Sequence, residues 1–191
     1  MSKARKGGGR RWIKWIFLGP LLLAFLVQVY FFLMVCVYAQ VNPGLTSFQS
    51  QQLDELRAKN PQAKLIQQWV PYAAISDNLK RAVVASEDAN FTDHDGVDWD
   101  ALEKAYDRNS TRRKVVGGGS TITQQLAKNL FLSGSRSYLR KGQEMVIAFM
   151  LETVMSKRRI LEIYLNVVEL GRGVFGAEAA ARHPACRPIH R

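Results

Sequence analysis

Apolar and polar positions divide the chain into parts that require different surroundings. Residues 15–39, WIFLGPLLLAFLVQVYFFLMVCVYA, contain no charged side chain. A helix of this length crosses a hydrocarbon core of about 30 Å, because each residue adds about 1.5 Å. Pro20 lies near one end of the run, where a missing backbone hydrogen bond is most easily tolerated. The pattern therefore predicts one transmembrane helix near the N-terminus.

Beyond residue 70 the apolar positions recur at the three- and four-residue spacing of helices. One helix ending near residues 86–88 is predicted by an apolar face made of Ile75, Leu79, Ala82 and Val83. Further helices are predicted over residues 121–131, 137–155 and 158–167. No stretch alternates convincingly as a half-buried strand does, so we expect a mainly α-helical fold.

One more helix is predicted from a capping signal. Asp98 is a candidate N-cap for a helix over residues 99–108. Its predicted inward positions are Leu102, Ala105 and Tyr106. The polar and basic stretch 109–116 that follows is predicted to be a loop.

The charge distribution also favours a membrane position. The chain has a net charge of +11, from 27 Lys and Arg against 16 Asp and Glu. Six basic residues and no acidic residue fall in residues 1–14, directly before the apolar run. Such a tail stays in the cytoplasm, so the rest of the chain is expected outside. Nucleic-acid binding is disfavoured, because the excess positive charge lies mainly at the membrane end.

A cleaved signal peptide is the alternative for the N-terminal segment. Val37-Tyr38-Ala39 resembles a small-residue cleavage site. The apolar run is longer than the usual signal core of roughly 7–15 residues, so we favour a retained anchor. The two cysteines, Cys36 and Cys186, form no disulfide framework and leave the redox compartment undecided.

The first candidate motif is EDANFTDHDG, residues 87–96, at the predicted end of an apolar helix. A carboxylate buried beside the negative end of a helix gains protons more readily, so Glu87 could act as a base or acid. Two alternatives stay open. Carboxylates at a helix end are commonly solvated, and Asp93, His94 and Asp95 could instead hold a metal ion.

The second motif is GGGSTITQQLAKN, residues 117–129. Glycines allow the backbone to approach a ligand closely, and Ser120 or Thr121 can cap the helix that follows. The free N–H groups of the first turn favour an anion. Gln124 and Lys128 share a face, where Lys128 can meet a phosphate as a point charge. A capped amphipathic helix with a solvated polar side explains the same residues.

The third and fourth motifs are RKGQE, residues 140–144, and KRRILEIYLN, residues 157–166. The simplest interpretation of Arg140 and Glu144 is a surface ion pair worth about 0.5 kcal/mol or less. However, Glu144 borders an apolar segment, which favours acid–base chemistry on a charged substrate. The fourth motif is interpreted mainly as architecture, with Glu162 and Asn166 holding neighbouring loops.

These four motifs, followed by GRGVFGAEAAAR, resemble the peptidoglycan glycosyltransferases of family 51, specifically the monofunctional membrane-anchored kind. Five motifs in one order are far more specific than any single short pattern. The resemblance implies a mainly α-helical, lysozyme-like domain behind a single N-terminal transmembrane helix. It also implies an enzyme that polymerises lipid II outside the bacterial cytoplasmic membrane.

The resemblance assigns two catalytic residues. Glu87 matches the glutamate that acts as general base on the 4-hydroxyl of the acceptor N-acetylglucosamine. That oxygen attacks C1 of the N-acetylmuramic acid at the lipid end of the growing chain. Undecaprenyl pyrophosphate leaves, and a β-1,4 linkage forms with inversion. Glu144 matches the second glutamate, which supports the donor side.

The same resemblance implies the substrate-binding residues. Lys128, Arg136 and Lys141 match basic residues that hold the donor pyrophosphate. Asp88, Phe91 and His94 belong to the motif that shapes the site around Glu87. The other positions implied to bind substrate are Ser120, Thr121, Gln124, Asn129 and Arg140.

The implied cofactors and partners follow from this chemistry. Mg²⁺ is a candidate at the pyrophosphate, since it holds phosphate oxygens well, and no organic cofactor is expected. Expected partners are lipid II, the growing glycan strand, membrane lipids and other cell-wall synthesis and division proteins, with no nucleic acid. The expected location is the inner membrane, with one membrane pass, a cytoplasmic N-terminus and a periplasmic catalytic domain.

The predicted organisation has five parts: a basic cytoplasmic tail (1–14), a transmembrane helix (15–39), a juxtamembrane connector with a short helix near 50–59 (40–70), the glycosyltransferase domain (71–183) and a divergent tail (184–191). After His183 the sequence departs from the family's pattern, so we expect a truncated or frameshifted C-terminus and an incomplete domain. Two other functions are therefore kept: a defective form that only binds lipid II or wall-synthesis partners, and a lytic enzyme that cleaves glycan.

Overall fold

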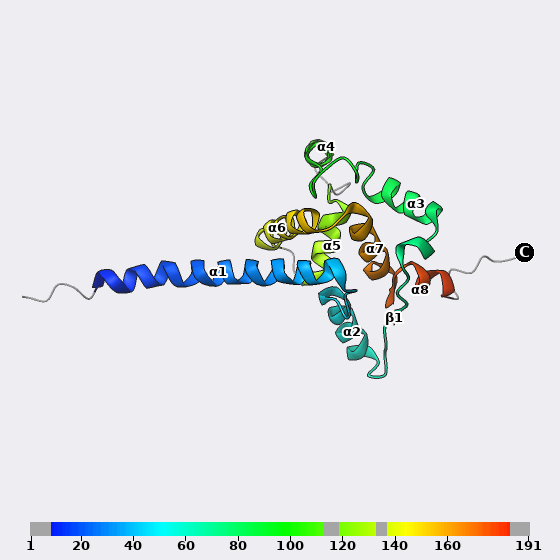
Figure 1. The fold of residues 1–191 in the computed structure, drawn as a ribbon, viewed down its shortest axis with the longest axis horizontal. Helices are drawn as coiled ribbons and strands as arrows, with labels where there is room; N and C mark the ends of the chain where they lie inside the picture. The colour runs from blue at the N-terminus through cyan, green and yellow to red at the C-terminus, as the bar shows by residue number, and fades with distance from the viewer. Residues whose placement is uncertain (1–8, 113–118, 133–136, 184–191) are drawn as a thin grey trace, which may run out of the picture.

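The computed structural model describes residues 9–112, 119–132 and 137–183. Figure 1 shows a long N-terminal helix, α1, projecting from a group of shorter helices. The elements in chain order are α1 (Gly9–Gln40), α2 (Ser47–Lys59), β1 (Ile66–Gln67), the 3-10 helix η1 (Tyr72–Ala74), α3 (Asp77–Glu87), α4 (Trp99–Arg112), α5 (Ile122–Phe131), α6 (Tyr138–Val154), α7 (Lys157–Val167), β2 (Glu169–Gly171), β3 (Val174–Phe175) and α8 (Ala177–Arg182). The predicted mainly α-helical fold is confirmed.

Helix α5 forms the centre of the core and packs against α2, α6 and α7. Its apolar positions Ile122 and Leu126 are fully buried, as are Ile147 and Leu151 of α6 and Ile163 of α7. Seven of the ten residues of α5 are buried, polar Gln124 and Asn129 among them. A helix surrounded in this way is held on several sides, so its polar side chains have fixed positions.

Hydroxyl side chains start the central helices. Thr121 caps α5 in a capping box, in which its hydroxyl accepts from the Gln124 backbone and the Gln124 side chain accepts from the Thr121 backbone. Ser137 and Ser156 cap α6 and α7 by accepting from backbone N–H groups three residues ahead. The predicted helices 121–131, 137–155 and 158–167 are therefore confirmed to within a residue or two at each end.

A small sheet, which the sequence pattern did not predict, joins the connector to the C-terminal part of the described chain. The strand order is β1-β3-β2, with β1 parallel to β3 and β2 antiparallel to it. These strands have only two or three residues, too few to show an alternating pattern. Gly176 follows β3 at φ +84°, where a Cβ would lie 2.6 Å from the Asn166 carbonyl oxygen. The sheet thus brings residues 66–67 of the connector against β3.

Helix α1 contains an apolar span, Trp15–Gln40, of 26 residues that is long enough to cross a membrane. This agrees with the predicted span at 15–39. The C-terminal part of α1 packs on the domain: Val35 is fully buried, and the Phe31 and Tyr38 rings lie 5.5 and 5.7 Å from the Phe131 ring.

Helix α4 corrects two predictions. Asp98 is its N-cap as expected, because Asp98 Oδ1 accepts from the Ala101 N–H at 2.8 Å. However, α4 continues to Arg112, so residues 109–112 are helical rather than part of the predicted loop. Ala105 faces inward as predicted, but Leu102 is 36% exposed and Tyr106 is 73% exposed, so the prediction is wrong for these two residues. No glycine or proline follows residue 108 to stop the helix there.

Candidate active site

Glu87 lies at the C-terminal end of α3, and its side chain is open to solvent. Glu87 Oε2 accepts a hydrogen bond from Gln125 Nε2 at 2.9 Å, and Gln125 Oε1 accepts from the Tyr164 hydroxyl at 3.0 Å. Of the two alternatives for Glu87, a buried and a solvated carboxylate, the structure shows the solvated one. The carboxylate is fixed at the surface by an amide, while one oxygen and the solvent side remain open.

Gln125 and Tyr164 were not among the predicted site residues. Tyr164 lies on the apolar face of α7, and burial together with the negative charge of Glu87 raises its pKa well above the usual value. Tyr164 therefore stays protonated and donates to Gln125. In the sequence, Tyr164 is distinguished only by a hydroxyl group within an apolar stripe. Gln125 lies next to Gln124, and nothing in the sequence shows that it contacts Glu87.

Asp88 links the end of α3 to the start of α5. Its buried carboxylate accepts from His94 Nε2 at 2.9 and 3.0 Å and from the Ile122 N–H at 3.0 Å. The Gly96 N–H donates to His94 Nδ1 at 3.1 Å, so the ring proton lies on Nε2. This network fixes the chain that carries Glu87.

The first-turn N–H groups of α5 are used inside the protein. The Ile122 N–H binds Asp88 and the Gln124 N–H binds the Thr121 hydroxyl, which itself donates to the Gly96 carbonyl at 2.6 Å. These two N–H groups are therefore not free for a substrate anion, which favours the alternative of a capped amphipathic helix for them. Gly119 also has an internal role, since a Cβ there would lie 2.9 Å from the Leu102 Cα of α4.

A second polar cluster lies between α5 and α6 and consists of Ser120, Gln124, Arg140, Lys141 and Glu144. Lys141 Nζ donates to Ser120 Oγ at 2.9 Å, to Gln124 Oε1 at 3.3 Å and to Glu144 Oε1. Arg140 Nη1 donates to Glu144 Oε2 at 3.0 Å. Glu144 is 3% exposed, so it is a buried carboxylate between two cations and not half of a surface ion pair.

The two cations of the cluster are partly accessible from solvent. Arg140 Nε is buried without a hydrogen-bond partner among the described residues. Lys141 remains one-third exposed at its side chain. Glu144 neutralises one of the two positive charges, so the cluster keeps a net positive charge.

The other predicted site residues have different surroundings. Lys128 lies half-buried one turn further along α5, with Nζ 5.6 Å from the Phe48 ring centroid. Asn129 is buried in the core, and Phe91 is buried edge-on to the His94 ring at 6.5 Å. Arg136 lies outside the described residues.

The fourth motif has the architectural role that its sequence predicted. Asn166 is fully buried and exchanges hydrogen bonds with the backbone of Val70, donating at 2.9 Å and accepting at 2.8 Å. Glu162 Oε1 accepts from the Tyr72 N–H at 3.2 Å. Both side chains therefore hold the segment before α3 against α7.

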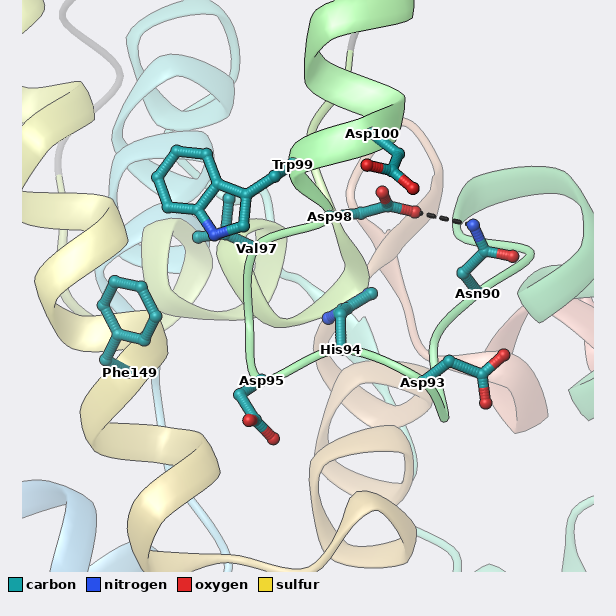
Figure 2. A pocket seen from close by; sticks show the side chains of 9 residues that line it. All are labelled: Asn90, Asp93, His94, Asp95, Val97, Asp98, Trp99, Asp100 and Phe149. Carbon is teal, nitrogen blue, oxygen red and sulfur yellow. Dashed lines mark hydrogen bonds between the residues drawn. The ribbon is translucent and has the colours of Figure 1, made fainter.

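A hollow of about 620 Å³ lies beside the first motif (Figure 2). Its acidic lining residues are Asp93, Asp95, Asp98 and Asp100. The Ala101 N–H and Asn90 lower the pKa of Asp98. The metal alternative for Asp93, His94 and Asp95 is a separate question, and in Figure 2 Asp93 and Asp95 extend to opposite sides of His94.

Across the described chain no group of three His, Cys, Asp or Glu could hold a metal ion, so this alternative finds no support.

Comparison with known proteins identifies the family. The transglycosylase family model matches residues 51–184. A protein of Herminiimonas arsenicoxydans named biosynthetic peptidoglycan transglycosylase is 64% identical over 174 residues, which are 91% of this chain and 75% of that protein. The chain belongs to the transglycosylase family. The resemblance expected from the five motifs is thereby confirmed.

Other transglycosylases of the same name agree. The Bordetella pertussis protein is 58% identical over 184 residues, 94% of this chain and 76% of the relative. The Dechloromonas aromatica protein is 54% identical over 173 residues, 91% of this chain and 75% of the relative. The family match begins at residue 51, within the predicted connector, while the predicted domain boundary at residue 71 stays a prediction.

Proposed function

We propose that this transglycosylase polymerises lipid II into β-1,4-linked glycan strands and releases undecaprenyl pyrophosphate. The names of its relatives support peptidoglycan as the product class. The observation that carries the proposal is the pair of sites on α5. Gln125 holds the open carboxylate Glu87, and its neighbour Gln124 holds the cationic cluster through Lys141. Two adjacent residues of α5 therefore hold the proposed base, Glu87, and the proposed anion-binding cluster.

Glu87 is the proposed general base. It accepts the proton of the acceptor 4-hydroxyl as that oxygen attacks C1 of the donor sugar. The hydrogen bond from Gln125 fixes one carboxylate oxygen, and the exposed side of the carboxylate is free to meet the sugar. Attack opposite the leaving group inverts the anomeric centre.

The Arg140–Lys141–Glu144 cluster is the proposed donor site. Negative charge develops on the pyrophosphate as the C1–O bond breaks, and fixed cations stabilise that charge. Glu144 is buried between both cations and orients them. The Lys141 ammonium, on a side chain that is one-third exposed, is the proposed contact for a phosphate oxygen. Lys128 and Arg136 are proposed for the donor side on the family resemblance alone.

The described cluster does not fit a metal held by the protein. Its one carboxylate is Glu144, and each of its oxygens is bound by a cation. We therefore derive no step through Mg²⁺, although the pyrophosphate itself has the oxygen ligands that this ion prefers.

The proposed location is the inner membrane, with residues 1–14 in the cytoplasm and the domain in the periplasm. The apolar span Trp15–Gln40 and the basic residues before it support this orientation. A substrate whose lipid stays in the bilayer also favours an anchored enzyme. Other cell-wall synthesis and division proteins remain proposed partners.

The test is to offer the full chain two substrates separately: labelled lipid II in detergent, and purified cell wall without lipid-linked sugar. We expect glycan polymer from lipid II and no soluble muropeptide from the wall. Muropeptide release without polymer would establish a lytic enzyme instead. Binding of lipid II without either product would establish a defective form.

A further inference from the structure

A hollow of about 280 Å³ lies between η1, α3 and the start of α7. Its described lining residues include none of the five that form the cluster between α5 and α6, and Glu87 is not among them. Small-ligand sites have volumes of ~300–1,000 Å³, so this hollow suits one or two side chains of a peptide rather than a sugar chain. It is therefore a separate feature from the proposed catalytic site.

The floor of the hollow is apolar and aromatic. Phe91 is 2% exposed and Leu161 is 5% exposed, and both belong to the main core. Val84 and the Tyr72 ring are half-buried and line the same hollow. Covering these carbon surfaces with an apolar group is favourable, whereas a free phosphate gains nothing from them. A ligand that fits the hollow thus has an apolar part.

Among the described residues, the rest of the lining is mainly basic and includes Lys80, Arg81, Lys157 and Arg158. Asp77 pairs with the Lys80 ammonium at 2.9 Å, and Glu152 pairs with the Lys157 ammonium at 2.8 Å. Arg81 attracts Asp77 from a longer distance. Both arginines are exposed, and neither forms an ion pair within the described chain. Two guanidinium groups can therefore bind carboxylates, each through two parallel N–H groups.

Two aromatic rings hold three of these cations beside the apolar floor. Lys80 Nζ lies 4.1 Å and Arg158 Cζ lies 4.9 Å from the centroid of the Tyr72 ring. Lys157 Nζ lies 4.8 Å from the centroid of the Phe91 ring. Cations within about 6 Å of a ring centroid are attracted by the electrons of the ring face. The positive charges thus border the apolar surface, which matches a ligand with an apolar group between carboxylates.

The hollow lies away from the apolar span of α1. In Figure 1, α3 lies beyond the C-terminal end of α1, while the apolar span projects in the opposite direction. Lipid headgroups and lipid-linked pyrophosphate are confined to the surface of a bilayer that this span crosses. A ligand of the hollow therefore comes from a molecule that extends away from the bilayer, as a segment of a protein partner does.

We propose that this hollow is the docking site for an acidic segment of a partner protein. One large apolar side chain of the segment covers Phe91 and Leu161, and the carboxylates on either side of it bind Arg81 and Arg158. The inference does not rest on lipid II polymerisation, because no step of that reaction is assigned to these four residues.

The first test measures binding of labelled peptides to the full chain in detergent by fluorescence anisotropy. Each acidic probe has two glutamates on either side of one leucine, methionine, phenylalanine or tryptophan. Matched probes replace the glutamates by glutamines or the apolar residue by glycine. We expect saturable binding of an acidic probe, and each replacement should weaken it roughly fivefold or more. No saturable binding by any acidic probe, or equal binding by its glutamine counterpart, would overturn the proposal.

Reversing the two exposed guanidinium charges tests where the peptide binds. Arg81→Glu with Arg158→Glu should weaken the acidic probes by roughly tenfold or more and create binding of lysine-flanked probes. Lys104→Glu with Arg108→Glu makes the same change in net charge on exposed α4 and should bind the acidic probes as the wild type does. Equal affinities in the two double variants would place the peptide elsewhere and overturn the site.

A milder pair of substitutions separates binding from folding. Arg81→Gln with Arg158→Gln removes both charges and adds none of the opposite sign. It should unfold at nearly the wild-type temperature, since both side chains are exposed, and should still weaken the acidic probes roughly tenfold. Wild-type affinity in this variant would contradict the proposed contacts.

Two competing anions decide whether the ligand is a protein segment. Soluble muropeptides and inorganic phosphate should displace the acidic probe only at concentrations roughly tenfold higher or more, because neither carries a large apolar group. Displacement by muropeptides at equal concentration would make the hollow a glycan site. Displacement by phosphate at equal ionic strength would make it a phosphate site, and either result would overturn the proposal. No polymerisation is measured, so failure of the proposed reaction leaves these outcomes unaffected.

Discussion

At the residue scale, the site depends on how each charged side chain is paired. Glu144 has both oxygens bound by cations and is 3% exposed, whereas Glu87 has one amide partner and faces solvent. The two glutamates therefore suit different roles in the proposed function. The open one can take a proton from a substrate, and the buried one can only hold cations in place.

Removing the Lys141 ammonium should reduce polymerisation far more than it affects folding. Lys141→Met keeps most of the side-chain volume but removes a donor to Ser120, Gln124 and Glu144. Loss of one charge-stabilising group at a reacting centre costs about 10²–10³ in kcat. Steady-state polymerisation kinetics measure this. Lys104→Met on exposed α4 is the control, and equal rates for both variants would contradict the donor-site role.

Local chemistry made some residues predictable from sequence and hid others. The Asp98 cap, the Thr121 cap and the loop-holding Asn166 follow from contacts near in sequence or from an unusual polar residue in an apolar stripe. Gln125 depends on contacts with Glu87 and Tyr164, each nearly forty residues away. Long-range pairs of this kind leave no periodic signal in one sequence.

At the element scale, Asp88 is the connection between α3 and α5. It binds His94 and the first N–H of α5 from a buried position. The same N–H groups were predicted from sequence to receive a substrate anion. The helix terminus was correctly identified as an anion site, but the anion is a side chain that local patterns could not place there.

Asp88→Asn should destabilise the domain by roughly 1–3 kcal/mol, because the amide nitrogen would take the place of one of the two oxygens that face the His94 Nε2–H, so that donor meets donor, and because the charge-assisted hydrogen bonds are lost. Denaturant unfolding of the full chain in detergent measures the change. Asp100→Asn, an exposed aspartate on α4, should differ little from the wild type. Polymerisation should also fall in Asp88→Asn, since Glu87 is its neighbour in the chain.

The Asp98 cap predicts a pH dependence of α4. Hydrogen bonds from the Ala101 N–H and from Asn90 hold the pKa of Asp98 below its usual range. Its contribution to stability is therefore fully present above about pH 4 and is lost as the pH falls through the lowered folded-state value. Asp98→Asn should reduce stability at pH 7 and weaken its dependence on pH in the acid range. An unchanged acid-unfolding curve would contradict the capping role.

At the scale of the whole molecule, the anchor belongs to the fold. Val35 is in the core, the rings of Phe31 and Tyr38 meet Phe131, and Arg159 binds the end of α1. The length and apolar composition of the span were predictable from sequence. Its packing was not, because the residues that meet it lie more than ninety positions away.

Arg159→Met should lower the thermal unfolding temperature, because two backbone carbonyls of Tyr38 and Val41 lose their donor. The expected cost is about 1–3 kcal/mol. Arg158→Met is the matched control, since its exposed guanidinium lies over the Tyr72 ring and makes no such bond. Similar unfolding temperatures for the two variants in detergent would show that α1 is only a tether.

The most direct test of the central claim is polymerisation of labelled lipid II by Glu87→Gln beside the wild type. Glutamine preserves size and the contact with Gln125 but cannot accept a proton, so lipid II should still bind while glycan polymer falls below detection. Glu55→Gln, on the exposed face of α2, should polymerise at the wild-type rate. Polymer formation by Glu87→Gln at a comparable rate would show that Glu87 is not the base and would contradict the mechanism.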